Sequence, residues 1–166
     1  MTYQIKLDVS GPPYGLRRRV FNGFKKHAFF KAGVFWHRLL RPKHFTNRGA
    51  TEYGYTPREG ERGSGRRFKN SYTAAKLKAR GHTRPLVWSG QSLALSQQRR
   101  IYATSKGVRV TMPVRAFNFR PKNSNVDMAR EFTAHTPAER ELITNRFVAA
   151  LSRQIRRATG RKTINI

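Results

Sequence analysis

The feature that constrains the fold most is a pair of alternating runs, residues 100–104 and 108–114, separated by three residues that end in Gly107. Apolar side chains take every second position of the later run, namely Val108, Val110, Met112 and Val114. This period of two predicts two half-buried strands, and Gly107 predicts a tight turn with a positive φ angle between them. Because an isolated hairpin is only marginally stable in water, its apolar face requires helices packed on it.

Helices that suit this purpose are predicted near both ends of the chain. Residues 14–40 carry apolar side chains at helical spacing until Pro42 stops the pattern, and Gly23 and Gly33 predict either one bent helix or two shorter ones. Residues 136–159 begin with the capping sequence Thr-Pro-Ala-Glu and end before a glycine, which predicts a second helix. Its apolar stripe consists of Ile143, Phe147, Ala150, Leu151 and Ala158. We expect the apolar face of the hairpin to pack on this stripe.

The remaining segments complete the predicted order of elements. Residues 3–9 alternate and predict a strand that pairs with the hairpin, with a mobile tail as the alternative. Between and beyond these elements we expect a long basic loop at 41–70, a short helix at 71–79, a central motif at 81–114, an irregular segment at 115–135 and a tail at 160–166. The central motif is expected to open with an extended segment, followed by a helical turn that Ser89 caps and then by the hairpin. The predicted fold class is α+β, a small antiparallel sheet built on the central hairpin and packed by a long N-terminal and a C-terminal helix, with long basic loops. Its 166 residues predict a single domain.

The net charge of the chain is the strongest indication of function. The sequence has 35 Lys and Arg against eight Asp and Glu, which gives a formal net charge of +27. A compact body with this charge repels itself, so the composition predicts a polyanionic partner or a neutralising assembly. Nucleic acid is the first candidate, because neutralised phosphates drive binding without sequence preference.

The cations expected to face a polyanion come from two parts of the chain. The first part lies between Val9 and Thr51, a stretch that contains no acidic residue. The second part is the end of the helix predicted at 136–159, together with the tail. The alternative is a solvated basic face, although such a face usually mixes both signs of charge. The candidate residues are Arg17, Arg18, Arg19, Lys25, Lys26, Lys31, Arg41, Lys43, Arg48, Arg153, Arg156, Arg157, Arg161 and Lys162.

A set of short motifs around the hairpin carries a family resemblance. The residues concerned are His82, Pro85, Leu86, Val87, Ser89, Gly90, Leu93, Met112, Pro113 and Arg115. Upstream, Lys43-His44-Phe45, Tyr53-Gly54-Tyr55, Ser71-Tyr72 and Lys76 extend the likeness, as does the helix from Thr136. These motifs resemble the tail-completion and neck proteins of tailed bacteriophages, a family that is similar to the phage Mu virion morphogenesis protein.

The resemblance implies a non-enzymatic structural protein of the virion that acts in tail completion or in head–tail joining at the neck. It also implies phage partners (portal or adaptor, tail terminator or tail tube), a homo-oligomeric ring, and a basic surface near DNA or an acidic partner ring. The implied location is the neck or tail of the virion, and the host cytoplasm during assembly. The alternative is a basic RNA- or DNA-binding module of the ribosomal-protein type, which leaves residues 82–115 unexplained and has no RNP or KH signature in support.

Chemical motifs do not predict an enzyme or a cofactor. The chain has no cysteine, and its five histidines lack the spacing of metal ligands. A metal-dependent nuclease needs clustered carboxylates, whereas Asp8, Asp127 and Glu131 could be gathered into one site only by coincidence. Ser89-Gly90 lacks the flanking glycine of a hydrolase nucleophile turn. We also expect no membrane partner, because no long uncharged apolar segment is present.

Overall fold

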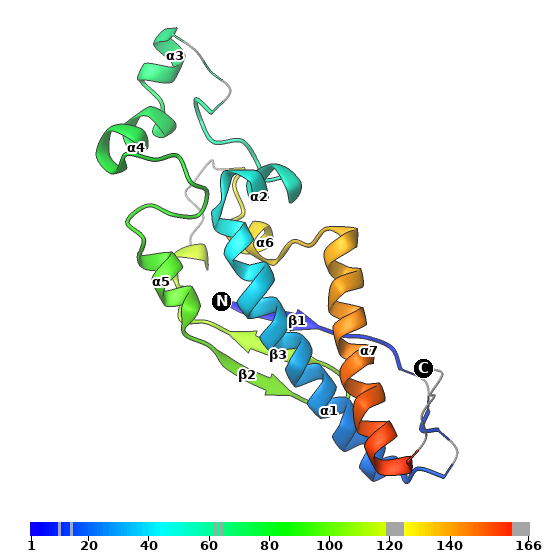
Figure 1. The fold of residues 1–166 in the computed structure, drawn as a ribbon. Coiled ribbons are helices and arrows are strands. Elements are labelled where there is room, and N and C mark those ends of the chain that lie inside the picture. Colours follow the sequence, from blue (N-terminus) through cyan, green and yellow to red (C-terminus); the bar gives the residue numbers. More distant parts are fainter. Residues whose placement is uncertain (10, 14, 62, 64, 119–124, 161–166) are drawn as a thin grey trace. The chain divides into compact units, whose positions relative to one another are not determined.

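The computed structural model describes residues 1–166 except 10, 14, 62, 64, 119–124 and 161–166 (Figure 1). The fold is α+β, with a β-hairpin in a small antiparallel sheet, as predicted. The chain divides into two compact units. The sheet unit spans Thr2–Leu40, Arg99–Thr111 and Pro137–Ile166, and the helical unit spans Met1, Arg41–Gln98 and Met112–Thr136. Each unit is described by itself.

The sheet has three strands, β1 (Thr2–Ile5), β2 (Arg100–Ala103) and β3 (Val108–Thr111), in the order β1-β3-β2. Both pairings are antiparallel, so the predicted hairpin and the added N-terminal strand are confirmed. The alternation in sequence continues to Val9, but β1 ends at Ile5. The reason is that Ile5 pairs with Val108, the first residue of β3, and residues beyond it have no strand to pair with.

The turn of the hairpin differs from the prediction. Gly107 is not among the glycines with a positive φ angle. Instead, a Cβ atom at this position would lie 2.6 Å from the carbonyl oxygen of Ile5, so the glycine allows β1 to approach closely. The turn is closed by a hydrogen bond of 2.8 Å from the Thr104 amide to the Gly107 carbonyl. The Thr104 hydroxyl accepts a second bond, from the Lys106 amide.

Two long helices complete the sheet unit. Helix α1 (Arg18–Phe35) lies against all three strands, and α7 (Pro137–Thr159) packs on α1 and runs antiparallel to it (Figure 1). A π-helix, η1 (Trp36–Leu40), continues α1, and both Gly23 and Gly33 lie within the single α-helix Arg18–Phe35. The Trp36 ring stacks on Tyr3 of β1, with ring centroids 3.7 Å apart.

The apolar stripe of α7 differs from the predicted one at its end. Ile143, Phe147 and Leu151 are buried, but the stripe continues to Ile155, one turn on, and Ala158 is exposed. The side chains of Phe29 and Phe147 join the two helices, with ring centroids 4.5 Å apart. The apolar face of the hairpin meets α1 rather than the predicted α7 stripe, through Gly33.

Replacing Gly33 or Gly23 of α1 with alanine should change the free energy of unfolding in opposite directions. A Cβ atom at Gly33 would lie 2.9 Å from Cγ2 of Val108 and 3.3 Å from Cγ2 of Val110, whereas one at Gly23 has nothing within 4 Å. We therefore expect Gly33→Ala to destabilise the fold by about 1–2 kcal/mol through overpacking. Gly23→Ala should stabilise it by about 0.5–1 kcal/mol through helix propensity. Chemical denaturation followed by helix circular dichroism measures both; equal shifts would contradict the close approach of α1 to β3.

Several short helices make up the helical unit. They are η2 (Arg41–Phe45), α2 (Asn47–Glu52), α3 (Gly65–Lys69), α4 (Tyr72–Arg80), α5 (Gln91–Gln97), η3 (Ala116–Asn118) and α6 (Met128–Thr133). The predictions of an uninterrupted loop at 41–70 and of an irregular segment at 115–135 were wrong. The local signals were capping residues: the Thr46 hydroxyl accepts from the Gly49 amide, and the Asp127 carboxylate accepts from the Arg130 amide, each at 3.0 Å.

The short helix predicted at 71–79 is confirmed. The extended segment and the Ser89 cap predicted for the opening of the central motif are not. The Ser71 hydroxyl caps α4, and Gly81 ends it with a φ angle of 69°. Helix α5 instead has Gly90 as its N-cap residue, with a φ angle of 82° and no side-chain capping bond, so Ser89 does not cap it. The segment before it is a turn rather than an extended run, because Leu86 takes a φ angle of 55°.

Aromatic rings form the core of the helical unit. Phe132 lies 5.5 Å from Phe45 and 5.1 Å from Phe117, measured between ring centroids. His44 stacks on Tyr53, and its Nδ1 atom lies 2.6 Å from the Tyr55 hydroxyl oxygen. Burial lowers the pKa of His44 to about 3, so this ring is neutral at neutral pH. Phe117 and Phe132 are both buried.

Candidate polyanion-binding surface

Most of the predicted cations of the sheet unit are exposed. The exposed ones are Arg17, Arg18, Arg19, Lys26, Lys31, Arg153, Arg156 and Arg157. Lys25 is half-buried, and its Nζ atom lies 5.2 Å from the centroid of the Phe21 ring. Arg161 and Lys162 lie outside the described residues. The two helices that carry the exposed cations are the pair α1 and α7 that pack on each other.

A hollow of about 90 Å³ lies between these two helices. Its rim is basic, with His27 and Lys31 on α1 and Arg146 and Arg153 on α7. We call these four residues the basic groove. The short side chains of Ala149 and Ala150, together with Gln154, line it between the charged residues.

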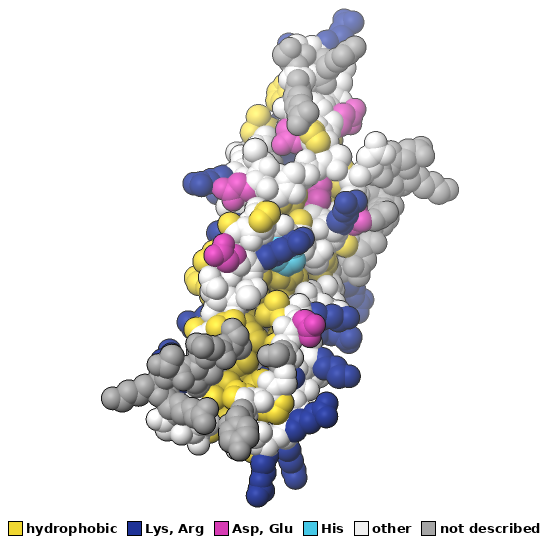
Figure 2. All heavy atoms as spheres, turned by 90° about the vertical axis from the view of Figure 1, so that its right-hand side faces the viewer, with side chains coloured by type: hydrophobic (Ala, Val, Ile, Leu, Met, Phe, Trp, Pro, Cys, Tyr) yellow, Lys and Arg dark blue, Asp and Glu magenta, His cyan; other side chains and the backbone are white. Residues whose placement is uncertain are grey.

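The helical repeat explains how the basic groove forms. His27 and Lys31 are four residues apart and Arg146 and Arg153 are seven apart, so each pair projects from one side of its helix. Because α1 and α7 are antiparallel, the arginine-rich last turns of α7 lie beside the start of α1 (Figure 1). In Figure 2, which faces the side that carries α7, Lys and Arg side chains gather toward the lower end, where α1 begins and α7 ends.

The start of α1 places positive charge where a helix favours negative charge. Arg17, Arg18 and Arg19, here called the arginine triplet, precede and open α1, whose first turn contains no acidic residue. The N-cap residue, Arg17, makes no side-chain capping bond. The helix dipole is positive at this end, and its first amides have no partners within the helix, so an anion there is favoured and cations are not. The charges at the start of α1 are therefore unfavourable in the free protein and favourable when an anionic ligand is bound there.

Acidic residues are scarce in the sheet unit. They are Asp8, Glu139 and Glu141, and of these Glu139 is buried. The ion pairs Arg48–Glu52 and Arg58–Glu131 both belong to the helical unit. The field around the basic groove is therefore strongly positive.

The predicted cations of the helical unit do not share one surface role. Arg41 is only 7% exposed, and its Nη1 atom donates to the Ser96 hydroxyl at 2.5 Å, so it is not a surface cation as predicted. Lys43 and Arg48 are exposed, and Arg48 pairs with Glu52 at 2.7 Å. We leave Arg41 out of the candidate surface.

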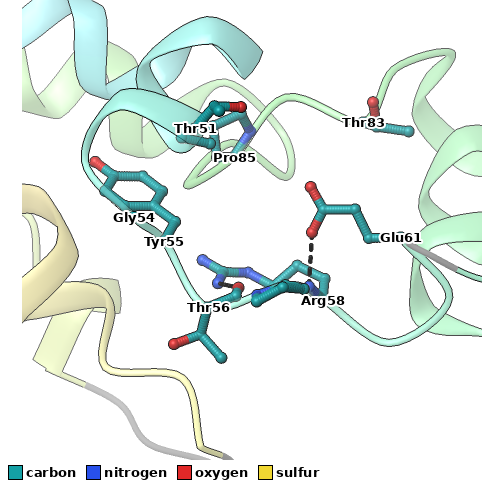
Figure 3. A pocket seen from close by; sticks show the side chains of 10 residues that line it. Thr51, Gly54, Tyr55, Thr56, Arg58, Glu61, Thr83 and Pro85 are labelled. Carbon is teal, nitrogen blue, oxygen red and sulfur yellow. Dashed lines mark hydrogen bonds between the residues drawn. The ribbon is translucent and has the colours of Figure 1, made fainter.

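The helical unit contains a second hollow, of about 290 Å³, organised by Arg58 (Figure 3). Arg58 donates to the Thr56 carbonyl and forms a double contact with the Glu131 carboxylate, and Glu61 accepts from its amide at 2.7 Å. Burial lowers the pKa of Arg58, but the hydrogen bond and charge of Glu131 outweigh that effect and raise it. The guanidinium thus joins the Thr56 backbone, on the wall of the hollow, to Glu131 of α6.

Four of the ten residues around the hairpin that carry the family resemblance are buried in the helical unit. Buried ones are Pro85, Leu86, Val87 and Met112, half-buried ones are His82, Leu93 and Gly90, and exposed ones are Ser89, Pro113 and Arg115. Lys76 is also buried, and its Nζ atom donates to the Arg84 carbonyl oxygen, directly before Pro85. Trp88 is 41% exposed, with its ring beside Tyr72 and Arg80. The motif therefore positions a packed turn.

Sequence reasoning missed His27 and Arg146 as members of the basic groove. Their helical spacing from Lys31 and Arg153 was visible, but the pairing of α1 with α7 was needed to bring the four together.

Comparison of the chain with protein-family models, curated proteins and solved structures finds no match. Within the described ranges, no group of three or more His, Asp or Glu residues is arranged to hold a metal ion. Nor is any described helix long and apolar enough to cross a membrane.

Proposed function

We propose that this chain is a structural protein of a tailed-bacteriophage virion that acts at the neck or tail end and contacts duplex DNA through the basic groove and the arginine triplet. The observation that carries the DNA contact is the gathering of cations from two packed helices around a hollow that has few acidic neighbours. Such a surface matches the phosphate backbone, which is the sequence-independent part of DNA recognition.

The placement in a virion is supported by the resemblance of residues 82–115 to the neck and tail-completion family. In that setting the protein has no chemistry to perform. Copies assemble as a ring or onto one, with phage neck and tail proteins as partners. The strong positive charge is neutralised in the assembly by DNA or by an acidic partner ring, which removes the self-repulsion of the free chain.

A deletion in the phage that encodes this chain tests the proposal. Without the protein, filled heads and tails should accumulate unjoined or leak DNA, and infective particles should fall by orders of magnitude. A plasmid copy should restore infectivity. The variant Lys31→Gln, Arg146→Gln, Arg153→Gln should restore it poorly. The control Lys69→Gln, Lys78→Gln, Arg84→Gln removes the same charge from exposed positions of the helical unit and should restore it fully.

Two results would count against the proposal. Normal yields of infective particles without the protein would remove it from virion assembly. Its co-sedimentation with ribosomes, together with absence from purified particles, would favour the basic module of the ribosomal-protein type.

A further inference from the structure

The sheet has a second, open face on the side away from α1. Side chains of a strand point alternately to the two faces, and Tyr3, Ile5, Val108 and Val110 are the buried set. Their neighbours in sequence therefore form the other face. The strand register aligns these neighbours in two rows: Gln4, Arg109 and Tyr102 in one, and Thr2, Thr111 and Arg100 in the other.

This open face combines positive charge with an accessible aromatic ring. Tyr102 is 57% exposed and lies directly opposite Arg109 on the neighbouring strand. Arg100 and Arg109 are exposed, and Lys6 and Lys106 extend the charge toward the turn. The three strands and the turn between β2 and β3 contain no acidic residue.

The same face is hollowed. A depression of about 400 Å³ is lined by Gln4, Lys6, Tyr102, Thr104, Lys106 and Arg109, among others. This volume falls within the range of sites that hold small molecules or parts of larger ones. The depression combines an aromatic ring, cations and hydrogen-bonding groups, which are the components that hold an unpaired nucleotide.

We propose that this face of the sheet binds single-stranded nucleic acid. Tyr102 stacks on an unpaired base, and Arg100, Arg109 and Lys106 contact the phosphates on either side of it. A duplex fits less well, because its bases are already stacked on one another and offer no free face to Tyr102. The inference is independent of the proposed neck function, since it uses a different face of the sheet unit and a different form of nucleic acid.

The test compares a labelled oligothymidylate of about 20 nucleotides, longer than a typical single-strand site, with a duplex of the same length. Tyr102→Ala should weaken binding of the single strand by about 5- to 100-fold, the usual effect of removing one stacking ring. Tyr102→Phe, which keeps the ring, should bind like the wild type. Neither variant should change the duplex affinity. A uridine oligomer, run in parallel, shows whether RNA or DNA is preferred.

Salt dependence gives a second measurement. The double variant Arg100→Gln, Arg109→Gln should reduce the log–log salt slope for the single strand by about 1.4, since each phosphate contact on a single strand contributes about 0.7. The variant Lys31→Gln, Arg146→Gln, Arg153→Gln should affect the duplex and leave the single strand nearly unchanged.

The proposal is overturned if folded Tyr102→Ala binds the oligothymidylate as the wild type does, or if it weakens single strand and duplex equally. Circular dichroism spectra confirm that the variant is folded. If the wild type binds the single strand through Tyr102 but does not bind the duplex, this inference stands and the duplex contact at the basic groove fails.

Discussion

We expect the affinity of the protein for duplex DNA to fall by about a thousandfold between about 50 and 200 mM salt. Six exposed cations stand around the basic groove and the start of α1, namely Arg17, Arg18, Arg19, Lys31, Arg146 and Arg153. If each neutralises one phosphate, the log–log slope of the binding constant against salt is near −5, from about −0.9 per contact. Fluorescence anisotropy with duplexes of unrelated sequence measures the slope, which should not depend on sequence.

Replacing the arginine triplet with glutamine should reduce the steepness of this slope by about three. The same variant should be no less stable than the wild type, because it removes three cations from the positive end of the α1 dipole. Loss of DNA affinity without loss of stability separates a binding role from a structural one. Thermal unfolding of the free variant supplies the second measurement.

The matched control again removes three charges from the helical unit, through Lys69→Gln, Lys78→Gln and Arg84→Gln. It should leave the slope close to the wild-type value. An equal reduction in both variants would show that net charge alone attracts DNA, with no defined surface. Absence of binding at the lowest salt would exclude duplex DNA as the direct partner and leave an acidic protein ring as the neutralising partner.

The largest expected effect on stability is that of Phe147→Ala. The Phe147 side chain is 2% exposed and lies against Phe29 at the contact between α1 and α7. Truncating a buried phenylalanine removes its burial energy and leaves a cavity, which together cost about 3–5 kcal/mol. Denaturant unfolding followed by helix circular dichroism should show this loss.

Leu142 on the same helix provides the control, since its side chain is 47% exposed. Leu142→Ala should change the free energy of unfolding by no more than about 0.5 kcal/mol. If the two variants unfolded at the same denaturant concentration, the apolar stripe of α7 would not be what joins it to α1.

The elements that were predicted correctly are those with signals inside a few residues. The hairpin follows from alternation at 100–104 and 108–114, and the closing helix from its capping sequence and its apolar stripe. Helix α4 follows from a serine before it and a glycine after it. In each case the local preference and the tertiary packing agree, so the sequence pattern is sufficient.

The errors arise where a distant part of the chain decides. Arg41 is buried because Ser96, 55 positions later, accepts its hydrogen bond, and nothing beside it in sequence indicates this. Gly107 is required by the carbonyl of Ile5, on a strand from the other end of the unit. Helices α2 and α6 were overlooked for another reason, since each has only six residues and too little length for an apolar period.

The candidate surface also has a part that the sequence predicts and a part that depends on contacts between distant elements. Composition alone predicted a polyanion-facing region, and most of its cations are exposed. The basic groove needed the pairing of α1 with α7, which contact each other across more than a hundred residues. The open face of the sheet needed the register that places Tyr102 beside Arg109.

The division of the chain into interleaved units has a consequence for how such a protein can vary through evolution. The helical unit consists chiefly of two excursions, Arg41–Gln98 and Met112–Thr136, each of which leaves the sheet unit between one element and the next. Without them, the remaining order is β1-α1-η1-β2-β3-α7. Segments that connect the elements of a scaffold accept insertions and deletions more readily than the elements do. Because every residue of the basic groove lies outside both excursions, a lineage could lengthen, shorten or replace either one while inheriting the same groove.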